Sequence, residues 1–179
     1  MRRYDNFWSP DECMYFRRAM ESSQWFTLSD MPYVQSQFPG CGNWSEGVIA
    51  PNEFEYLQNR LDPIVDINPY TFALNYFSYG AGDSLILHDD SDNVAGDSGT
   101  DFVQFREVRH TAVISYVHEQ WESNWGGELV IDDEYIIPQP GLLITFRVPQ
   151  EHRIARVKPQ AGKNRRLSIA GWVISTKKP

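Results

Sequence analysis

The feature that most constrains the fold of this 179-residue chain is a change of hydrophobic period near residue 70. Before it, residues 10–22 and 51–61 carry apolar side chains at helical spacing. After it, the predicted strands are 71–80, 84–90, 110–117, 128–132, 141–148, 152–157 and 166–175. These strands are short, are rich in β-branched and aromatic residues, and are separated by turn signals rather than by helix-length segments. The pattern indicates an antiparallel sandwich or barrel.

Capping signals define the start of the first helix. Ser9 can accept a hydrogen bond at the helix N-terminus, Pro10 fits the first helical position, and Glu12 stands three residues after the cap. Residues 27–50 contain several prolines and glycines, and we expect them to form a loop. Residues 91–109 are acidic and contain glycine, and they are expected to form a loop or a lid.

Length predicts a single domain over residues 1–179. We expect residues 1–69 to form a helical and loop region that packs on a β core of residues 70–176. No segment is long and apolar enough to span a membrane. Cys13 and Cys41 match no zinc spacing and no disulfide framework, and they suit a reducing compartment. A cytoplasmic location is therefore expected, and the oligomeric state is left open.

Charge argues against one class of partner. Sixteen basic and twenty-four acidic residues give a formal net charge of −8. A protein that coats a phosphate backbone usually carries a positive charge, so nucleic acid is not expected as a partner. Basic residues concentrate only in 153–166.

His88 and Asp90 form a His-x-Asp pair at the end of a predicted strand. Because residues i and i+2 of a strand point to one face, the imidazole and the carboxylate can reach the same ion. A distant histidine would complete a facial triad with three open positions, as a non-haem Fe(II) oxygenase requires. His152, which opens the predicted strand 152–157, is the candidate. Taken alone, His88 also fits a surface turn with a solvated imidazole.

Several longer motifs occur in a fixed order along the chain. These are DNFWSPDEC, YGAG followed by His88-x-Asp90, ISYVHEQWESNWGGELVI, PQPGLLITFRVPQEHRIARV and RRLSIAGW. In these motifs the chain resembles the prolyl 4-hydroxylase-like family of Fe(II)- and 2-oxoglutarate-dependent oxygenases over nearly its whole length. The resemblance implies a mainly β fold with flanking helices, namely a double-stranded β-helix, which is a cupin-like jelly roll.

The resemblance implies roles for several residues. The metal ligands would be His88, Asp90 and His152. Arg166 corresponds to the residue that pairs with the distal carboxylate of 2-oxoglutarate, for which a guanidinium fork is well suited. The other residues implied to contact 2-oxoglutarate are Ser168 and Tyr116, at the same carboxylate, and Tyr79, beside the metal.

The turn before Arg166 is longer than is usual in the family, so Arg165 is an alternative to Arg166. Strand parity favours Arg166, because Ser168 and Trp172 follow on its face. Trp125 and Trp172 are both expected to be packing residues.

The implied reaction hydroxylates a substrate C–H bond while 2-oxoglutarate and O2 are converted to succinate and CO2. Asp90 favours hydroxylation, because related halogenases carry a small residue at that position. The first choice of substrate, by analogy with the family, is a prolyl residue of a peptide or protein. A free amino acid or another small molecule is the alternative. The acidity of residues 91–109 would suit a basic peptide or an amine, but a solvated loop is the better explanation.

Two other functions compete. The segment from Tyr79 to Asp90 also resembles AlkB-type nucleic-acid demethylases, but those carry a second arginine where this chain has Trp172. A jelly-roll binding module without catalysis is the non-enzyme alternative, with the aromatic-rich residues 1–50 as a partner surface. The set of ligands together with Tyr116 and Arg166 argues for an enzyme.

Overall fold

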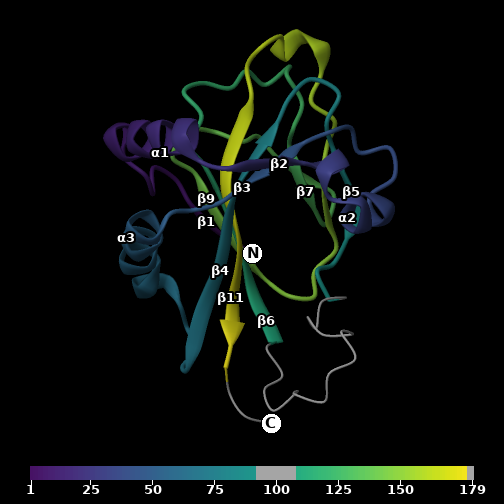
Figure 1. The fold of residues 1–179 in the computed structure, drawn as a ribbon. Coiled ribbons are helices and arrows are strands. Elements are labelled where there is room, and N and C mark those ends of the chain that lie inside the picture. The colour runs from purple at the N-terminus through teal and green to yellow at the C-terminus, as the bar shows by residue number, and fades with distance from the viewer. Residues whose placement is uncertain (92–107, 177–179) are drawn as a thin grey trace.

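A computed structural model describes residues 1–91 and 108–176 of the chain as two antiparallel sheets, with the two longer helices together on one side (Figure 1). The larger sheet has the strand order β1-β9-β6-β11-β4-β3-β2 and the smaller one β5-β10-β7-β8. The strands of the larger sheet are β1 (Arg2–Tyr4), β2 (Trp25–Thr27), β3 (Ser45–Gly47), β4 (Tyr70–Tyr79), β6 (Val108–Tyr116), β9 (Leu143–Arg147) and β11 (Arg166–Ser175). The smaller sheet contains β5 (Leu85–His88), β7 (Leu129–Ile131), β8 (Glu134–Ile136) and β10 (His152–Ile154). This is the expected jelly roll.

The centre of the larger sheet is the ladder between β4 and β11. Its register runs without a shift from Arg166 opposite Tyr79 to Ser175 opposite Tyr70. The side chains of β4 therefore alternate between the helix side and the side facing the smaller sheet. Phe72, Leu74 and Tyr76 face the helices, because they belong to the core that the helices cover. The residues between them face the inside of the jelly roll.

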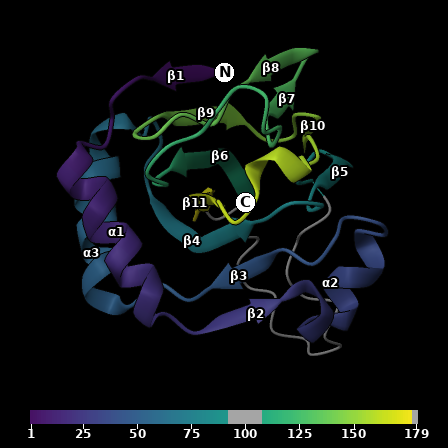
Figure 2. The ribbon, with the colours of Figure 1, turned by 90° about the horizontal axis from the view of Figure 1, so that it is seen from above.

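The helices α1 (Pro10–Ser22) and α3 (Pro51–Leu61) lie together on the outer face of the larger sheet, away from β5 and β10 (Figure 2). The predicted cap of α1 is confirmed, since the Ser9 hydroxyl accepts from the backbone N–H of Glu12 at 3.2 Å and the Glu12 carboxylate accepts from that of Ser9 at 2.8 Å. Phe16 and Leu57 are fully buried in the core between these helices and the sheet. The helices α1 and α3 thus pack on the β core.

The region 27–50 contains more regular structure than a loop. It holds a short helix, α2 (Pro32–Gln37), the strand β3, and three 3-10 residues, Leu28–Asp30. The strands β1 and β8 were not predicted either. Tertiary pairing decides elements this short, because three residues are too few to show a period. The enlarged turn before β11 contains a single 3-10 turn, Pro159–Ala161.

The predicted loop 91–109 lies mostly outside the described residues, which end at Ser91 and resume at Val108. Val108 and Arg109 belong to β6, so the strand begins two residues earlier than expected. No helix in the described part of the chain is long and apolar enough to cross a membrane.

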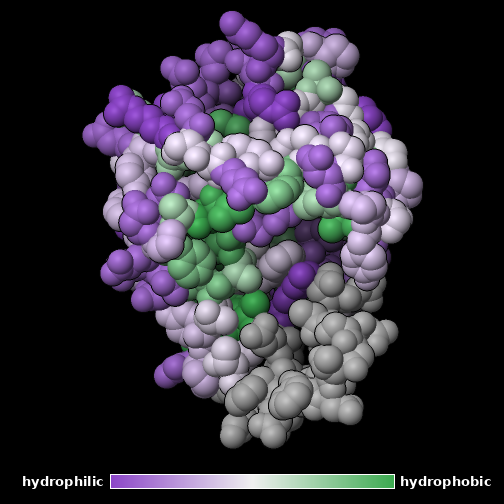
Figure 3. Space-filling view, in the orientation of Figure 1, coloured by the Kyte–Doolittle hydropathy of each residue, from purple (hydrophilic) through white to green (hydrophobic). Residues whose placement is uncertain are grey.

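Apolar side chains gather near the middle of the face shown in Figure 3, over the N-terminal strands and α3. Phe26 and Val48 are exposed large apolar residues of this region, at 38% and 48%. The edge of the larger sheet formed by β2 and β3 therefore keeps accessible apolar surface.

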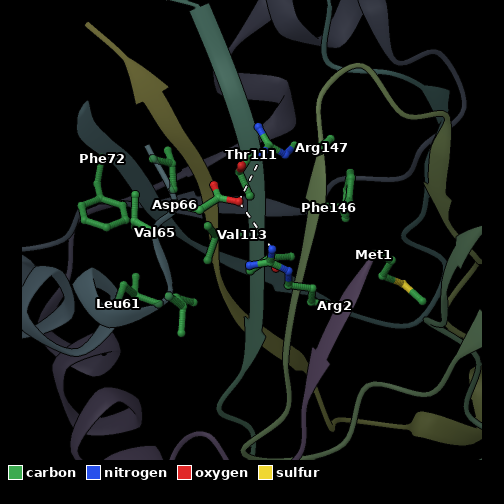
Figure 4. A pocket seen from close by; sticks show the side chains of 13 residues that line it. Met1, Arg2, Leu61, Val65, Asp66, Phe72, Thr111, Val113, Phe146 and Arg147 are labelled. Carbon is green, nitrogen blue, oxygen red and sulfur yellow. Dashed lines mark hydrogen bonds and ion pairs between the residues drawn. The ribbon is translucent and has the colours of Figure 1, made fainter. Parts of the chain in front are cut away.

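A small cavity of about 230 Å³ lies on the helix side of the larger sheet, beside α3 and β1. In Figure 4, Asp66 stands between Arg2 and Arg147, with N–O distances of 3.5 and 3.1 Å. Because all three side chains are well exposed, these ion pairs add little to stability. The cavity is separated from the predicted site by the sheet.

The ladder between β4 and β11 predicts a strict requirement for glycine at position 171. Gly171 has φ +152°, and a Cβ there would lie 1.9 Å from the carbonyl oxygen of Ala73. We expect Gly171→Ala to lower the free energy of unfolding by about 3 kcal/mol or to prevent folding. Gly40→Ala is the matched control, since Gly40 also has positive φ but open space around it. It should cost about 1 kcal/mol in the same denaturant titration. Equal losses for both variants would contradict the steric explanation.

Candidate metal and cosubstrate site

The pairing of β10 with β5 brings the two predicted histidine ligands together. His152 is the direct cross-strand partner of His88, and their ring centroids lie 4.1 Å apart. The Nδ1 atoms of His88 and His152 each lie 2.8 Å from a backbone carbonyl oxygen, that of Ile86 and of Gln150 respectively. A carbonyl only accepts hydrogen bonds, so each Nδ1 carries the proton. The Nε2 lone pair of each neutral ring is then free to bind a metal.

Asp90 completes the cluster, although not through strand alternation as predicted. Strand β5 ends at His88, and Asp90 lies beyond it with φ +63°, in the left-handed region that aspartate tolerates better than most residues. This turn directs the carboxylate toward both imidazoles. Its Oδ1 lies 3.5 Å from Nε2 of His88, and its Oδ2 lies 3.7 Å from Nε2 of His152.

The donor atoms of these three residues all lie within 4.8 Å of one another. Two imidazole nitrogens and one carboxylate oxygen at this spacing fit a single divalent cation and leave part of its coordination sphere open. Burial lowers the pKa of His152, and the neighbouring ring of His88 lowers it further. The ring of His152 is therefore held in the neutral form that binds metals. Phe146 packs edge-on against it.

Trp172 hydrogen bonds to the carboxylate of Asp90, so it does more than the packing expected of it. Its indole Nε1–H donates to Oδ2 at 2.9 Å. The guanidinium of Arg109 lies 3.5 Å from the Trp172 ring centroid, and its Nη1 lies 3.9 Å from Asp90 Oδ1. Strand parity was the available signal for Trp172, because it shares a face of β11 with Arg166. Nothing in the sequence linked Arg109 to Asp90.

Arg166 is buried, at 1% exposure, and faces the same interior. Its Nε–H donates to the carbonyl of Gly127 at 2.9 Å, Nη2 to the Tyr116 hydroxyl at 3.2 Å, and Nη1 to the Ser168 hydroxyl at 3.5 Å. Among the described residues, no carboxylate pairs with this guanidinium. A buried cation without a counter-ion is costly, so the geometry fits an anionic ligand at this point.

Two tyrosines flank the guanidinium of Arg166. Its Cζ lies 4.8 Å from the ring centroid of Tyr116 and 5.3 Å from that of Tyr79. Burial raises the pKa of both phenols, so both stay protonated and can donate hydrogen bonds. Trp44 stacks on Tyr79 with a centroid distance of 5.6 Å.

Arg165 points the other way, as strand parity predicts. Its Nη2 donates to the carbonyl of Ser78 at 3.0 Å and lies 3.8 Å from the carboxylate of Asp83. The structure therefore separates the two adjacent arginines, and only Arg166 shares a cavity with the histidine pair.

A single cavity of about 790 Å³ joins these groups. The predicted site residues that line it are His88, Asp90, His152, Arg166, Ser168 and Tyr79. Tyr116 reaches it through its hydrogen bond with Arg166. The cavity is large enough for a dicarboxylate and part of a second molecule.

Comparison with known proteins is consistent with this geometry. A profile described as the 2OG-Fe(II) oxygenase superfamily matches residues 74–174, more than half of the chain. The comparison with curated proteins finds no match.

Several solved structures share the fold at low sequence identity. A prolyl-4-hydroxylase from Pseudomonas putida has a TM-score of 0.64 at 15% identity, covering 96% of this chain and 90% of that one. A prolyl hydroxylase from Trichoplax adhaerens, solved with a hypoxia inducible factor peptide fragment, has a TM-score of 0.64 at 16% identity and covers 96% and 82%. HygX from Streptomyces hygroscopicus, solved with nickel and 2-oxoglutarate, has a TM-score of 0.66 at 13% identity and covers 98% and 82%.

The contact between Trp172 and Asp90 predicts an effect on metal affinity. We expect Trp172→Phe to keep the aromatic surface under Arg109 but to weaken Fe(II) or Co(II) binding about tenfold, because the carboxylate loses its orienting donor. Metal titration of the purified protein measures this. Trp121→Phe is the control, since it also removes an indole hydrogen bond, to the carbonyl of Gly126, away from the cluster. An unchanged metal affinity in Trp172→Phe would show that the hydrogen bond is incidental.

Proposed function

Because this chain belongs to the 2OG-Fe(II) oxygenase superfamily, we propose that His88, Asp90 and His152 hold its Fe(II) and that it hydroxylates a substrate C–H bond. Enzymes of this superfamily are dioxygenases that use Fe(II), 2-oxoglutarate and O2. The observation that carries the residue assignment is the convergence of three donor atoms within 4.8 Å, next to a buried arginine that has no counter-ion among the described residues.

Fe(II), 2-oxoglutarate and O2 together would supply the oxidising chemistry, with O2 as the oxidant and succinate and CO2 as products. The contribution of the chain is to fix the ligands and exclude water. The carbonyls of Ile86 and Gln150 set the tautomer of the two imidazoles. Trp172 orients the carboxylate of Asp90. Such contacts hold the ligand side chains in position before the metal and the cosubstrate bind.

The cosubstrate would lie between the metal ligands and Arg166. The guanidinium would bind the distal carboxylate of 2-oxoglutarate, with the hydroxyls of Ser168 and Tyr116 as further donors. Tyr79, stacked under Trp44, would form the wall beside the metal. Charge compensation supports this orientation, since 2-oxoglutarate supplies the anion that the buried arginine lacks.

Hydroxylation is favoured over halogenation because Asp90 occupies the carboxylate position. A carboxylate bound to the metal leaves no vacancy there for a halide ion. The hydrogen bonds and ion-pair contacts to Asp90 from Trp172 and Arg109 further hold it in place.

Removing a metal ligand tests the assignment. We expect Asp90→Ala and His152→Ala each to abolish succinate formation from 2-oxoglutarate and to lower the affinity for Fe(II) at least about tenfold. Asp89→Ala is the matched control, because the neighbouring carboxylate bonds to Ser91 and is not in the cluster. If Asp89→Ala and Asp90→Ala behave alike, the ligand assignment is wrong.

The two adjacent arginines provide a second test. Arg166→Ala should raise the KM for 2-oxoglutarate about tenfold to a hundredfold, because hydrogen bonds to a charged group are lost. Arg165→Ala should leave that KM unchanged, since its side chain is committed to Ser78 and Asp83. A raised KM in Arg165→Ala alone would reverse the assignment of the cosubstrate pocket.

For the substrate, we propose a prolyl residue of a peptide or protein. The prolyl hydroxylases among the structural neighbours support this choice, although at identities of 15–17% they share only the fold. A free amino acid or another small molecule is the alternative. An AlkB-type role is less supported, because Trp172 stands in place of that family's second arginine. Succinate formation should rise with proline-containing peptides and not with free amino acids or methylated DNA. If only free amino acids or only methylated DNA stimulate succinate formation, the proposed prolyl substrate is wrong.

A further inference from the structure

Glu46 of β3 lies in the same cavity as the metal cluster, although the chemistry described above does not use it. Direct cross-strand partners point to the same face of a sheet, and the partners of Glu46 lead across the sheet to the cosubstrate pocket, so Glu46 faces inward. Glu46 pairs with Phe77, and Phe77 pairs with Ser168, whose hydroxyl contacts Arg166. Two strand spacings, about 10 Å, therefore separate Glu46 from Ser168.

The carboxylate of Glu46 is only partly satisfied. Its Oε1 accepts a hydrogen bond from Nδ2 of Asn75 at 2.6 Å. No lysine, arginine or histidine of the described residues forms an ion pair with it, and no described group donates to Oε2. Both guanidiniums that line the cavity contact other groups. That of Arg109 lies over Trp172 and near Asp90, and that of Arg166 donates to the hydroxyl of Tyr116. Burial raises the pKa of the Glu46 carboxyl, as expected for an anion without a counter-ion.

Aromatic residues lie close to Glu46 in the sequence and on both neighbouring strands. Trp44, two residues before Glu46, lines the cavity, and its centroid lies 6.0 Å from that of Phe77 and 6.4 Å from that of Phe38. Phe26 is the partner of Glu46 on its other side and is 38% exposed. An anionic group among aromatic faces is a characteristic arrangement for binding organic cations, because the ring faces and the carboxylate all attract positive charge.

We infer that Glu46, with Trp44 and Phe77, binds a positively charged group of the substrate, an alkylammonium or a guanidinium, while the reactive C–H bond lies at the metal. This inference rests on the proposed function, because it assigns part of the same cavity to the substrate. It narrows the substrate class to peptides that carry a lysine or arginine near the modified residue, or to cationic small molecules. The carboxylate of Glu46 acts as a specificity determinant and takes no part in the reaction.

Probe pairs that differ in charge test this inference. The anaerobic enzyme, loaded with Fe(II) and 2-oxoglutarate, is titrated with Nα-acetyl-lysine amide and its norleucine counterpart, and with Nα-acetyl-arginine amide and its citrulline counterpart. We expect at least one cationic probe to bind about tenfold more tightly than its neutral partner, as is typical of a charge-assisted hydrogen bond. The pair that shows the preference distinguishes an ammonium from a guanidinium.

Glu46→Gln is the decisive variant, because glutamine keeps the size of the side chain and the hydrogen bond with Asn75 while removing the charge. In this variant the cationic and the neutral probe should bind with about equal affinity, and the affinities for Fe(II) and 2-oxoglutarate should be unchanged. Glu134→Gln removes the same charge at an exposed position outside the cavity and should keep the preference. A preference that persists in Glu46→Gln, or no preference or no binding in the unmodified enzyme, would overturn the inference.

Metal and cosubstrate binding, measured in the same samples, separates this failure from that of the proposed function. If the unmodified enzyme fails to bind Fe(II) and 2-oxoglutarate, the proposed function fails whatever the probes do. If it binds both but does not discriminate between charged and neutral probes, only the inference about Glu46 is lost.

Discussion

The pairing of β10 with β5 is the contact on which the site depends. It places His152 directly opposite His88, although the two are far apart in the sequence. Strand β10 is also paired with β7 on its other side, so His152 is held between two neighbours. Metal ligands held by backbone hydrogen bonds on both sides have little freedom to move. This rigidity allows the third proposed ligand, Asp90, to come from a turn instead of a strand, because only one of the three side chains has to be positioned by local structure.

Arg166 imposes the second constraint. A guanidinium buried to 1% exposure would be unfavourable in an apolar interior, and the hydrogen-bond acceptors around it only partly compensate. The hydroxyl of Tyr116 and the carbonyl of Gly127 fix its orientation but cannot neutralise its charge. The long β4–β11 ladder offsets this cost by anchoring the strand from which Arg166 projects. The fold therefore stabilises a charge that only an anionic ligand would balance.

The regular strands were the part of the fold that the sequence revealed best. Strand β11 spans ten residues without a break, so parity correctly separated Arg166 from Arg165. The same rule predicted that the carboxylate of Asp90 lies close to His88, as it does in the structure, but for the wrong reason, because the strand ends at His88 and a left-handed residue redirects the chain. A turn of this kind depends on tertiary contacts and leaves no period in the sequence.

Short elements and lateral contacts could not be predicted in the same way. The three-residue strands β1, β2 and β3 are defined by partners that are distant in sequence, and β8 is defined by a short hairpin with β7. The hydrogen bond between Trp172 and Asp90 joins residues 82 positions apart. Parity showed which way Trp172 points but not what it would meet. Glu46 was missed for the same reason, because residues 27–50 were expected to form a loop and a loop has no inward face.

The distribution of charge in the cavity gives Glu46 its importance. With metal and cosubstrate bound, Asp90 and the carboxylates of 2-oxoglutarate would offset the charges of the metal and Arg166, so the reactive end would carry little net charge. Glu151, another acidic residue lining the cavity, is exposed and screened by solvent. The half-buried carboxylate of Glu46 is screened much less. A cationic substrate would therefore be oriented by the carboxylate of Glu46 near β3 more than by the metal. The C–H bond that reacts would be the one whose distance from the positive group of the substrate matches the distance from Glu46 to the metal.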